Sequence, residues 1–420
     1  MAGRWAAFGL ALVVVPACGF GGAVERSPRP ETRPDTRQAV VSQASFRPDA
    51  GFSAWVAGFR GRALAQGIAP ETFERAFAAA GFLPQVIERD RRQAEFTRAI
   101  WDYLDSAVSE TRVANGRAVM AEHRAVLDRI EARFGVDKEV VVAIWGLESA
   151  YGAVRGDTPL IAALATLAYD GRRGAFFEDQ LIAALRILQA GDVAPAAMTG
   201  SWAGAMGHTQ FMPTSYLAYA ADYHGDGRRD IWADDPADAL ASTANYLARF
   251  GWQKGQPWGV EVVLPAGFDF AQAGKGTRRA VGDWARAGVR AAGGGALPDH
   301  GPASILLPAG ARGPALMIFD NFRVISRYNS ADSYVIAVGH LADRIGGGGP
   351  FRAGWPRGDR ALEPDERRAL QALLTRAGFD TRGVDGRIGP NTIAAIRAWQ
   401  RAVGEVPDGY ATAATLERLR

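Results

Sequence analysis

The stretch Trp145-Gly146-Leu147-Glu148-Ser149-Ala150-Tyr151-Gly152 is the most informative part of this chain. It places one carboxylate directly after an apolar run, residues 140–145. Burial beside such a run disfavours the charged form of a carboxyl group and raises its pKa. A carboxyl group that stays protonated near neutral pH is suited to act as a general acid. The octet alone leaves a second interpretation open, in which Glu148 is a helix-terminal residue bonded to nearby backbone.

The bulk composition indicates a globular protein with more than one core. The chain has 420 residues, of which 48% are hydrophobic and 22% are charged. A chain of this length exceeds what one hydrophobic core usually supports. The formal net charge is only +3, and no run of basic residues with interleaved aromatics occurs. We therefore expect no nucleic-acid partner.

The first 18 residues are typical of an export signal. Residues 6–15 form an apolar segment too short to span a bilayer, and they lead into Ala17-Cys18. Cys18 is the only cysteine, so an intramolecular disulfide is excluded. We predict a lipoprotein-type signal over 1–18, with Cys18 lipidated and the protein anchored in the envelope, facing the periplasm from the outer membrane. Ordinary cleavage after Ala17, giving a soluble periplasmic protein, is the alternative.

The remaining chain divides into a tether, a large folded part, a linker and a small domain. Residues 19–48 are rich in Pro, Arg, Ser and Thr, which predicts a flexible tether. Across 49–345 the apolar residues recur mainly at helical spacing, with short strand patterns near 260–264, 305–308 and 315–319. We predict a mainly α (α+β) fold with a minor β element.

A run of four glycines and a proline, Gly346-Gly347-Gly348-Gly349-Pro350, marks the clearest boundary. Such a run ends the preceding helix and does not hold a fixed conformation cheaply. We therefore predict a Gly-rich linker over 346–360 and a separate small domain over 361–420.

Several sequence blocks in the folded part carry a family signature when taken together and in order. The blocks are Asp90-Arg91-Arg92-Gln93-Ala94-Glu95-Phe96, the Glu148 octet, Leu164-Ala165-Thr166-Leu167-Ala168-Tyr169-Asp170-Gly171-Arg172-Arg173, Gly200-Ser201-Trp202-Ala203-Gly204-Ala205-Met206-Gly207-His208-Thr209-Gln210-Phe211-Met212-Pro213, and Arg327-Tyr328-Asn329. With these blocks the chain resembles the membrane-bound lytic murein transglycosylase B family, within the lysozyme-like superfamily, from about residue 52 to residue 344.

The last 60 residues resemble a peptidoglycan-binding domain of the common three-helix type. Two Asp-Gly pairs predict tight turns, and Pro390 lies where a helix would begin. The blocks that carry this resemblance are residues 370–374, 385–392, 395–400, 408–409 and 415–416. Peptidoglycan glycan strands are the partner that both resemblances imply.

The resemblance implies cleavage of the β-1,4 bond between N-acetylmuramic acid and N-acetylglucosamine. The muramic acid 6-hydroxyl attacks its own anomeric carbon and leaves a 1,6-anhydro ring, so one carboxyl group can serve where most glycosidases need two. We find no second carboxylate in a comparable apolar setting, because Asp157 and Asp170 adjoin turn residues. A muramidase that uses water and a non-catalytic wall-binding protein are the alternatives.

The same resemblance implies the roles of individual side chains. Glu148 is acid and then base, and ten residues match positions along the substrate groove. For several of these a structural role is the alternative: Phe211 as core, the tyrosines as hydrogen-bonded packing, the arginines as a solvated pair. The groove positions are Ser149, Arg172, Arg173, Ser201, Gln210, Phe211, Tyr246, Tyr328, Asn329 and Tyr334.

One acidic loop has the pattern of a calcium site. Asp222, Asp226, the carbonyl of Arg228 and Asp238 would be the ligands of an EF-hand-like loop, which some members of the family carry. His224 departs from the pattern, and no Glu closes a loop of twelve residues. The alternative is an Asp/Gly turn held by its own hydrogen bonds. The reaction itself requires no cofactor, so calcium would be structural.

Overall fold

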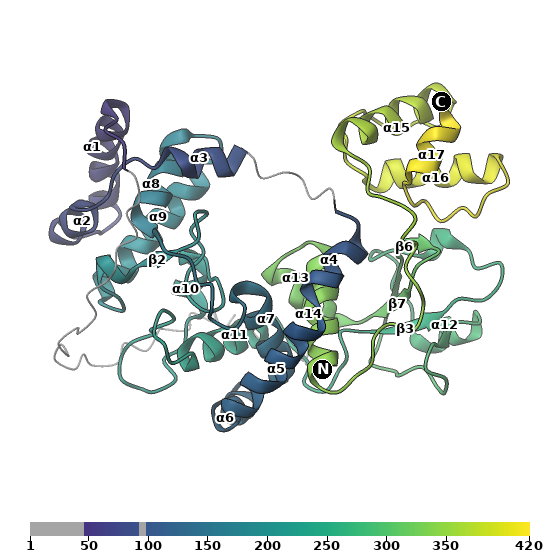
Figure 1. Cartoon of the computed structure of the whole chain (residues 1–420), viewed down its shortest axis with the longest axis horizontal. Helices are drawn as coiled ribbons and strands as arrows, with labels where there is room; N and C mark the ends of the chain where they lie inside the picture. Colours follow the sequence, from purple (N-terminus) through teal and green to yellow (C-terminus); the bar gives the residue numbers. More distant parts are fainter. Residues whose placement is uncertain (1–45, 92–97) are drawn as a thin grey trace, which may run out of the picture.

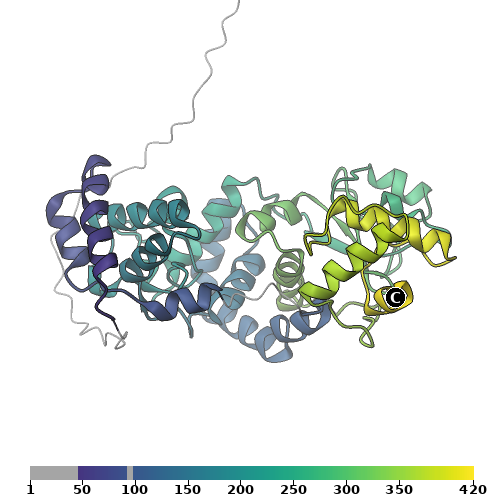
Figure 2. The same cartoon turned by 90° about the horizontal axis from the view of Figure 1, so that it is seen from above.

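The computed structural model describes residues 46–91 and 98–420. The predicted signal segment, Cys18 and most of the predicted tether lie outside the described residues. Helices dominate, with two small antiparallel sheets, as the mainly α (α+β) prediction requires. Figures 1 and 2 show four groups of elements: one helical group at one end of the long axis, one in the middle, and the β element and the C-terminal helices together at the other end. No helix in the described ranges combines the length and the apolar character needed to cross a membrane.

The first group is built around two packed helices, α8 and α9 (Figure 1). Residues 160–168 of α8 are all buried, as expected of a helix that is apolar on every side. α1 and α2 are separated at Gly67, whose φ of 85° ends the first helix. The elements of this group are α1 (Ala50–Ala65), α2 (Pro70–Phe77), α3 (Pro84–Arg91), β1 (Thr158–Pro159), α8 (Leu160–Asp170), α9 (Gly174–Ala190), η1 (Pro195–Ala197), β2 (Thr199–Gly200) and α10 (Pro213–Tyr219).

The central group surrounds α7, the helix that carries Glu148. Residues 140–146 of α7 are buried, and α5, α6, α11 and α14 all pack against it. α7 is therefore the central helix of this group, with other helices packed around it. The group consists of α4 (Ile100–Ala107), α5 (Glu110–Glu122), α6 (Arg124–Phe134), α7 (Lys138–Ser149), α11 (Ala237–Arg249), α13 (Asp320–Tyr328) and α14 (Asp332–Ile345).

The third group is a small β element inserted between α11 and α13. Its four-stranded antiparallel sheet has the order β4-β3-β7-β5, with Gly259 opposite Ile318 in the central pair. Trp284 is fully buried in its separate core. The elements are β3 (Gly259–Val263), η2 (Phe270–Gln272), α12 (Val281–Arg286), β4 (Arg290–Ala291), β5 (Ser304–Leu306), β6 (Pro308–Ala311) and β7 (Ala315–Ile318).

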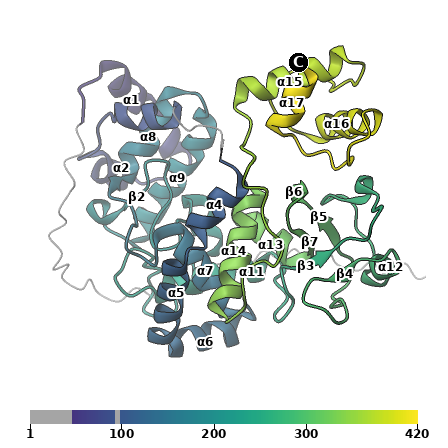
Figure 3. The same ribbon diagram turned by 45° about the vertical axis from the view of Figure 1, so that its right-hand side comes forward.

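The C-terminal group has three helices, α15 (Pro364–Arg376), α16 (Pro390–Ala402) and α17 (Ala413–Leu419), around a core of their own. A capping box between Glu363 and Glu366 fixes the start of α15. Figures 1 and 3 show the three helices beyond β6. There the carboxylate of Asp408 accepts the N–H of Ala311 at 2.9 Å.

The segment after the glycine run is held against the body of the protein. α14 ends at Ile345, where the glycines begin. The ring of Phe351 stacks on His340 at 4.0 Å, and Glu261 accepts the two backbone N–H groups that follow Phe351, each at 2.7 Å. The linker therefore differs from a free hinge, because a ring stack and a carboxylate fix it directly after the glycines.

Candidate active site

Glu148 lies at the C-terminal end of α7 and receives a hydrogen bond from Tyr334 of α14. The Tyr334 hydroxyl donates to Glu148 Oε1 at 2.6 Å. Burial raises the pKa of Glu148 from 4.5 to about 7, against the opposing effect of the Tyr334 bond. Burial therefore makes the protonated form of Glu148 available near neutral pH, as a general acid requires.

The backbone directly after Glu148 is strained. Ala150 and Tyr151 both have left-handed φ angles, 49° and 60°, and Gly152 follows with 87°. Such conformations cost about 1–3 kcal/mol each in residues other than glycine, and they cluster at functional sites. The turn folds the ring of Tyr151 back onto α7, where a Cβ on Gly146 would lie 2.5 Å from a ring carbon.

Ser149 connects this turn to the Gly-rich block. Its buried hydroxyl donates to the carbonyl of His208 at 2.5 Å and accepts the N–H of Gly152 at 2.9 Å. Ser149 therefore faces protein, and it fixes the backbone next to Glu148.

His208 makes a second connection to the same helix. Trp145 Nε1 can only donate, and it lies 3.1 Å from His208 Nδ1, so Nδ1 accepts. The proton of the neutral ring is then on Nε2, which donates to the carbonyl of Ala233 at 2.7 Å. Burial lowers the pKa of His208 and so favours this neutral form. Sequence reasoning did not select His208, because neither contact is local.

Gln210 also has a left-handed backbone, with φ 54°. Its Nε2 donates to the carbonyls of Arg155 and Gly207 at 3.0 and 2.9 Å. Among the described residues no donor reaches its Oε1, which leaves an acceptor for a sugar amide or hydroxyl. Ser201, in the same block, accepts the N–H of Ala205 at 3.0 Å and closes a turn.

Phe211, Tyr246 and Tyr328 form one aromatic cluster, with ring centroids 5.0–5.9 Å apart. Phe211 is 2% exposed, so it is core, the alternative that composition favoured. The hydroxyls of Tyr246 and Tyr328 donate to the carbonyls of Arg327 and Thr209, both at 2.6 Å. The cluster therefore fixes the end of α13 against the Gly-rich block.

Asn329 lies next to α13, and Tyr103 lies within reach of the Glu148 charge. Asn329 is exposed just after α13, where its Oδ1 accepts the N–H of Ala331 at 3.0 Å. Tyr103 of α4, which sequence reasoning missed, lies close enough to Glu148 for that charge to act on it. Burial and the Glu148 charge both raise the pKa of Tyr103. The only sequence signal for Tyr103 was its helical spacing, which indicates packing and not a site.

Arg172 and Arg173 both bind one buried carboxylate, that of Asp90. Arg172 Nε lies 2.6 Å from Oδ2 and Arg173 Nη2 lies 2.7 Å from Oδ1, while Asp90 is 2% exposed. Hydrogen bonds from Arg172 hold the pKa of Asp90 below its usual range. The two guanidinium groups are close to half exposed, and both are paired with Asp90. They therefore form an ion-paired cluster and not the solvated pair considered from the sequence.

The acidic loop is held by its own backbone. Asp222 accepts the N–H groups of two loop glycines at 2.6 and 2.8 Å, and Asp226 accepts that of Arg228 at 3.0 Å. Asp238 accepts two further loop N–H groups at 2.7 and 2.8 Å. Within residues 46–91 and 98–420, no three His, Cys, Asp or Glu side chains are grouped to hold a metal ion. In this arrangement the loop carboxylates bind the loop's own backbone N–H groups, as the Asp/Gly-turn alternative predicts.

Comparison with known proteins agrees with this geometry. Residues 51–343 match the family model of the transglycosylase SLT domain, and residues 363–419 match that of a peptidoglycan binding domain. The membrane-bound lytic murein transglycosylase B of Escherichia coli is 34% identical over 250 residues, which cover 58% of this chain and 66% of that protein.

Solved structures extend the likeness to most of the chain. SltB3 from Pseudomonas aeruginosa, in complex with NAG-anhNAM-pentapeptide, is 51% identical, with a TM-score of 0.85 over 89% of this chain and 100% of that chain. Slt35 from Escherichia coli, in complex with calcium, is 30% identical, with a TM-score of 0.60 over 72% and 95% of the two chains. The resemblance inferred from the motifs is thereby confirmed: the chain belongs to the SLT family of lytic transglycosylases, lyases that act on peptidoglycan, and it carries a C-terminal peptidoglycan-binding domain.

Proposed function

We propose that this enzyme cleaves the β-1,4 bond between N-acetylmuramic acid and N-acetylglucosamine without water and leaves 1,6-anhydro-N-acetylmuramic acid ends. The observation that carries the proposal is Glu148, a single carboxyl group with a pKa of about 7 at the end of a buried helix. The SltB3 complex with an anhydro-muramic acid ligand supports the same product.

In the first step Glu148 gives its proton to the glycosidic oxygen as the bond from that oxygen to the anomeric carbon breaks. Tyr334 donates to Oε1, which leaves Oε2 to carry the acidic proton in this step. Protonation of the leaving oxygen avoids release of an alkoxide and accelerates cleavage by about 10²–10⁴-fold.

In the second step the 6-hydroxyl of the muramic acid attacks its own anomeric carbon and forms the anhydro ring. The hydroxyl proton passes to the Glu148 carboxylate and restores the acid. No water is consumed and no cofactor is required, because the substrate supplies the nucleophile. The hydrogen bond from Tyr334 stabilises the carboxylate between the two steps, since it lowers the pKa of Glu148.

The surroundings of Glu148 support a mechanism with one carboxyl group. Its pKa is set by burial and by the Tyr334 hydroxyl, and no second carboxylate in the described residues perturbs it. A hydrolase with inverting or retaining chemistry would place a second carboxyl group within about 5–10 Å. We further propose that Gln210 Oε1 and the exposed amide of Asn329 bind the sugars, and that Arg172 and Arg173 contribute positive charge to the groove.

The decisive experiment is mass spectrometry of the fragments released from purified peptidoglycan. Products lighter by one water than reducing muropeptides are expected. Reducing ends would show that water is the nucleophile and would overturn the proposal. Binding without any released fragment would favour a wall-binding protein without catalysis.

The C-terminal domain, in this proposal, holds the enzyme on the insoluble wall and raises the local concentration of cleavable bonds. Truncation after Arg360 keeps the packed linker and removes α15 to α17. The truncated enzyme should retain its rate on soluble fragments and lose activity on intact sacculi. Equal activity of both proteins on sacculi would contradict this role.

We propose that the protein works in cell-wall remodelling and turnover at the periplasmic face of the envelope, anchored through a lipid on Cys18. The amino-acid pattern before Cys18 supports the anchor. Labelling of the expressed protein with a radioactive fatty acid tests it, with Cys18→Ser as the control. Label in the wild type alone is expected, and equal absence from both would favour the soluble periplasmic alternative.

A further inference from the structure

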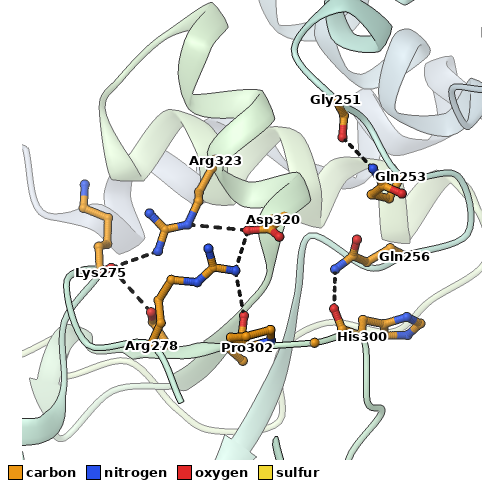
Figure 4. A network of polar contacts seen from close by, with 12 residues as sticks. Gly251, Gln253, Gln256, Lys275, Arg278, His300, Pro302, Asp320 and Arg323 are labelled. Carbon is orange, nitrogen blue, oxygen red and sulfur yellow. Dashed lines mark hydrogen bonds and ion pairs between the residues drawn. The ribbon is translucent and has the colours of Figure 1, made fainter. Parts of the chain in front are cut away.

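A cluster of cations lies where the β element meets α13 (Figure 4). Arg278 and Arg323 converge on the carboxylate of Asp320, with nitrogen–oxygen distances of 2.7 and 3.7 Å. Arg323 also donates to the carbonyl of Lys275 at 3.0 Å, and Arg278 to that of Pro302 at 3.0 Å. These bonds hold the two guanidinium groups in a fixed arrangement.

The cluster continues along α13 as a strip with excess positive charge. Lys275 pairs with Asp332 at 2.6 Å, and Arg327 follows Arg323 by one turn of the helix. Arg327 is exposed and has no carboxylate partner in the described part of the chain. We define the basic strip as Lys275, Arg278, Arg323 and Arg327; with its two carboxylates it carries a net charge of +2.

The strip is open to ligands. The side chains of Lys275, Arg278 and Arg323 are 48%, 37% and 43% exposed. Each partner carboxylate is itself partly exposed, so an incoming anion can share the guanidinium donors without displacing a buried ion pair. Arg is well suited to such binding, because its planar fork presents several N–H groups to a carboxylate.

The strip is also linked through neighbouring residues to the surroundings of Glu148. Arg327 directly precedes Tyr328 and Asn329, and its carbonyl is fixed by the Tyr246 hydroxyl. Asp332, the partner of Lys275, begins α14, and two residues later Tyr334 donates to Glu148. One end of the strip therefore lies next to Asn329 in the chain, and the strip continues from there along α13.

We propose that the basic strip binds the carboxylates of the stem peptide carried by the muramic acid at the cleavage site, so that the enzyme discriminates in favour of peptide-bearing glycan strands. This inference rests on the proposed function, which supplies the substrate. The dimensions agree: α13 has nine residues and is about 13 Å long, while a five-residue stem extends to about 17 Å. A stem that leaves the groove at Asn329 can therefore reach Arg323 and Lys275.

Calorimetric titration of the Glu148→Gln protein, which should not consume its ligand, tests the proposal directly. The probes are a tetrasaccharide fragment that bears pentapeptide stems and the same fragment stripped of them by an amidase. The further double substitution Lys275→Gln with Arg323→Gln should weaken binding of the stem-bearing fragment by about three- to tenfold, since each exposed charge pair contributes about 0.2–1 kcal/mol. Binding of the stripped fragment should not change.

The matched control is Arg60→Gln with Arg124→Gln, which also removes two exposed, ion-paired arginines, from α1 and α6. It should leave both affinities as they are. Equal weakening for both fragments, the same weakening in the control, or no preference of the parent protein for stems would each overturn the inference. These outcomes are independent of the chemistry: released reducing ends would refute the proposed reaction and leave the binding result standing.

Discussion

The hydroxyl of Tyr334 donates to Glu148 Oε1 at 2.6 Å, across 186 residues of sequence. It opposes the effect of burial on the Glu148 carboxyl group. Burial raises the pKa of Glu148, so the protonated form is available near neutral pH. The hydrogen bond from Tyr334 stabilises the carboxylate form. One side chain can therefore serve both steps of the proposed reaction.

Glu148→Gln should abolish release of anhydro fragments from peptidoglycan while wall binding persists. The amide keeps the shape of the side chain but cannot transfer the proton, so a loss of about 10³-fold or more is expected. The measurement is the rate of fragment release, followed by chromatography, together with sedimentation of the protein with sacculi.

The control for this substitution is Asp157→Asn. Asp157 is the nearest exposed carboxylate downstream of the octet, and its replacement should change the rate by less than about threefold. A comparable loss from Asp157→Asn would mean that a second carboxyl group takes part in the reaction.

The pH profile of kcat/KM should fall as pH rises through about 7, because Glu148 must be protonated in the free enzyme. Tyr334→Phe removes the hydrogen bond that lowers the pKa of Glu148. Its alkaline limb should therefore move to higher pH, while the maximal rate falls about tenfold through lost orientation. Steady-state kinetics across pH on a soluble oligosaccharide measure both effects.

Tyr223→Phe provides the matched control for this profile. The Tyr223 hydroxyl is buried without a hydrogen-bond partner in the described residues, so its removal should cost little. An unchanged profile in Tyr334→Phe, or the same shift in Tyr223→Phe, would refute the role of the Tyr334 bond.

Glu148 should make the protein less stable at alkaline pH. The folded protein binds this proton up to a pKa of about 7 and the unfolded chain only up to about 4.5, so the contribution is present below 4.5 and is lost as pH rises through 7. The loss amounts to at most about 3 kcal/mol. Glu148→Gln should therefore gain stability over the wild type as pH rises.

Urea unfolding at pH 5 and pH 8 measures this gain. The difference between Glu148→Gln and the wild type should be larger at pH 8, and Asp157→Asn gives the baseline for an exposed carboxylate. A difference that does not depend on pH would mean that the carboxyl group is not desolvated in the folded protein.

Gly146→Ala should destabilise the protein by about 2 kcal/mol or more, because the new methyl group would lie 2.5 Å from the ring of Tyr151. The displaced turn should also lower activity. Gly61→Ala is the matched control, since Gly61 also lies in a helix and a methyl group there would have no neighbour within 4 Å. It should stabilise by about 0.5–1 kcal/mol. Thermal unfolding compares the two, and equal effects would refute the packing argument.

The helix that carries Glu148 and the strands β3, β5 and β7 were predictable because their signals are local. An apolar run ending in Glu148 predicted a buried helix with a desolvated carboxyl group, and the structure has α7 with a raised pKa at that position. The glycine run predicted the end of α14 at the correct residue. The packing of the segment behind the glycines was not predictable, because it depends on the ring of His340 and the carboxylate of Glu261.

The sequence by itself determined the secondary structure, the order of the motifs and the residue that can act as an acid, because periodicity and composition act over a few neighbouring residues. Only the tertiary structure decided which side chains become hydrogen-bond and ion-pair partners. It brought Tyr334 to Glu148, His208 to Trp145, and Asp90 to Arg172 over 186, 63 and 82 residues. Such pairs arise when separate helices pack around a common core, and many packings satisfy the same local pattern. Only the packing that buries the apolar faces and also pairs the polar groups forms the site.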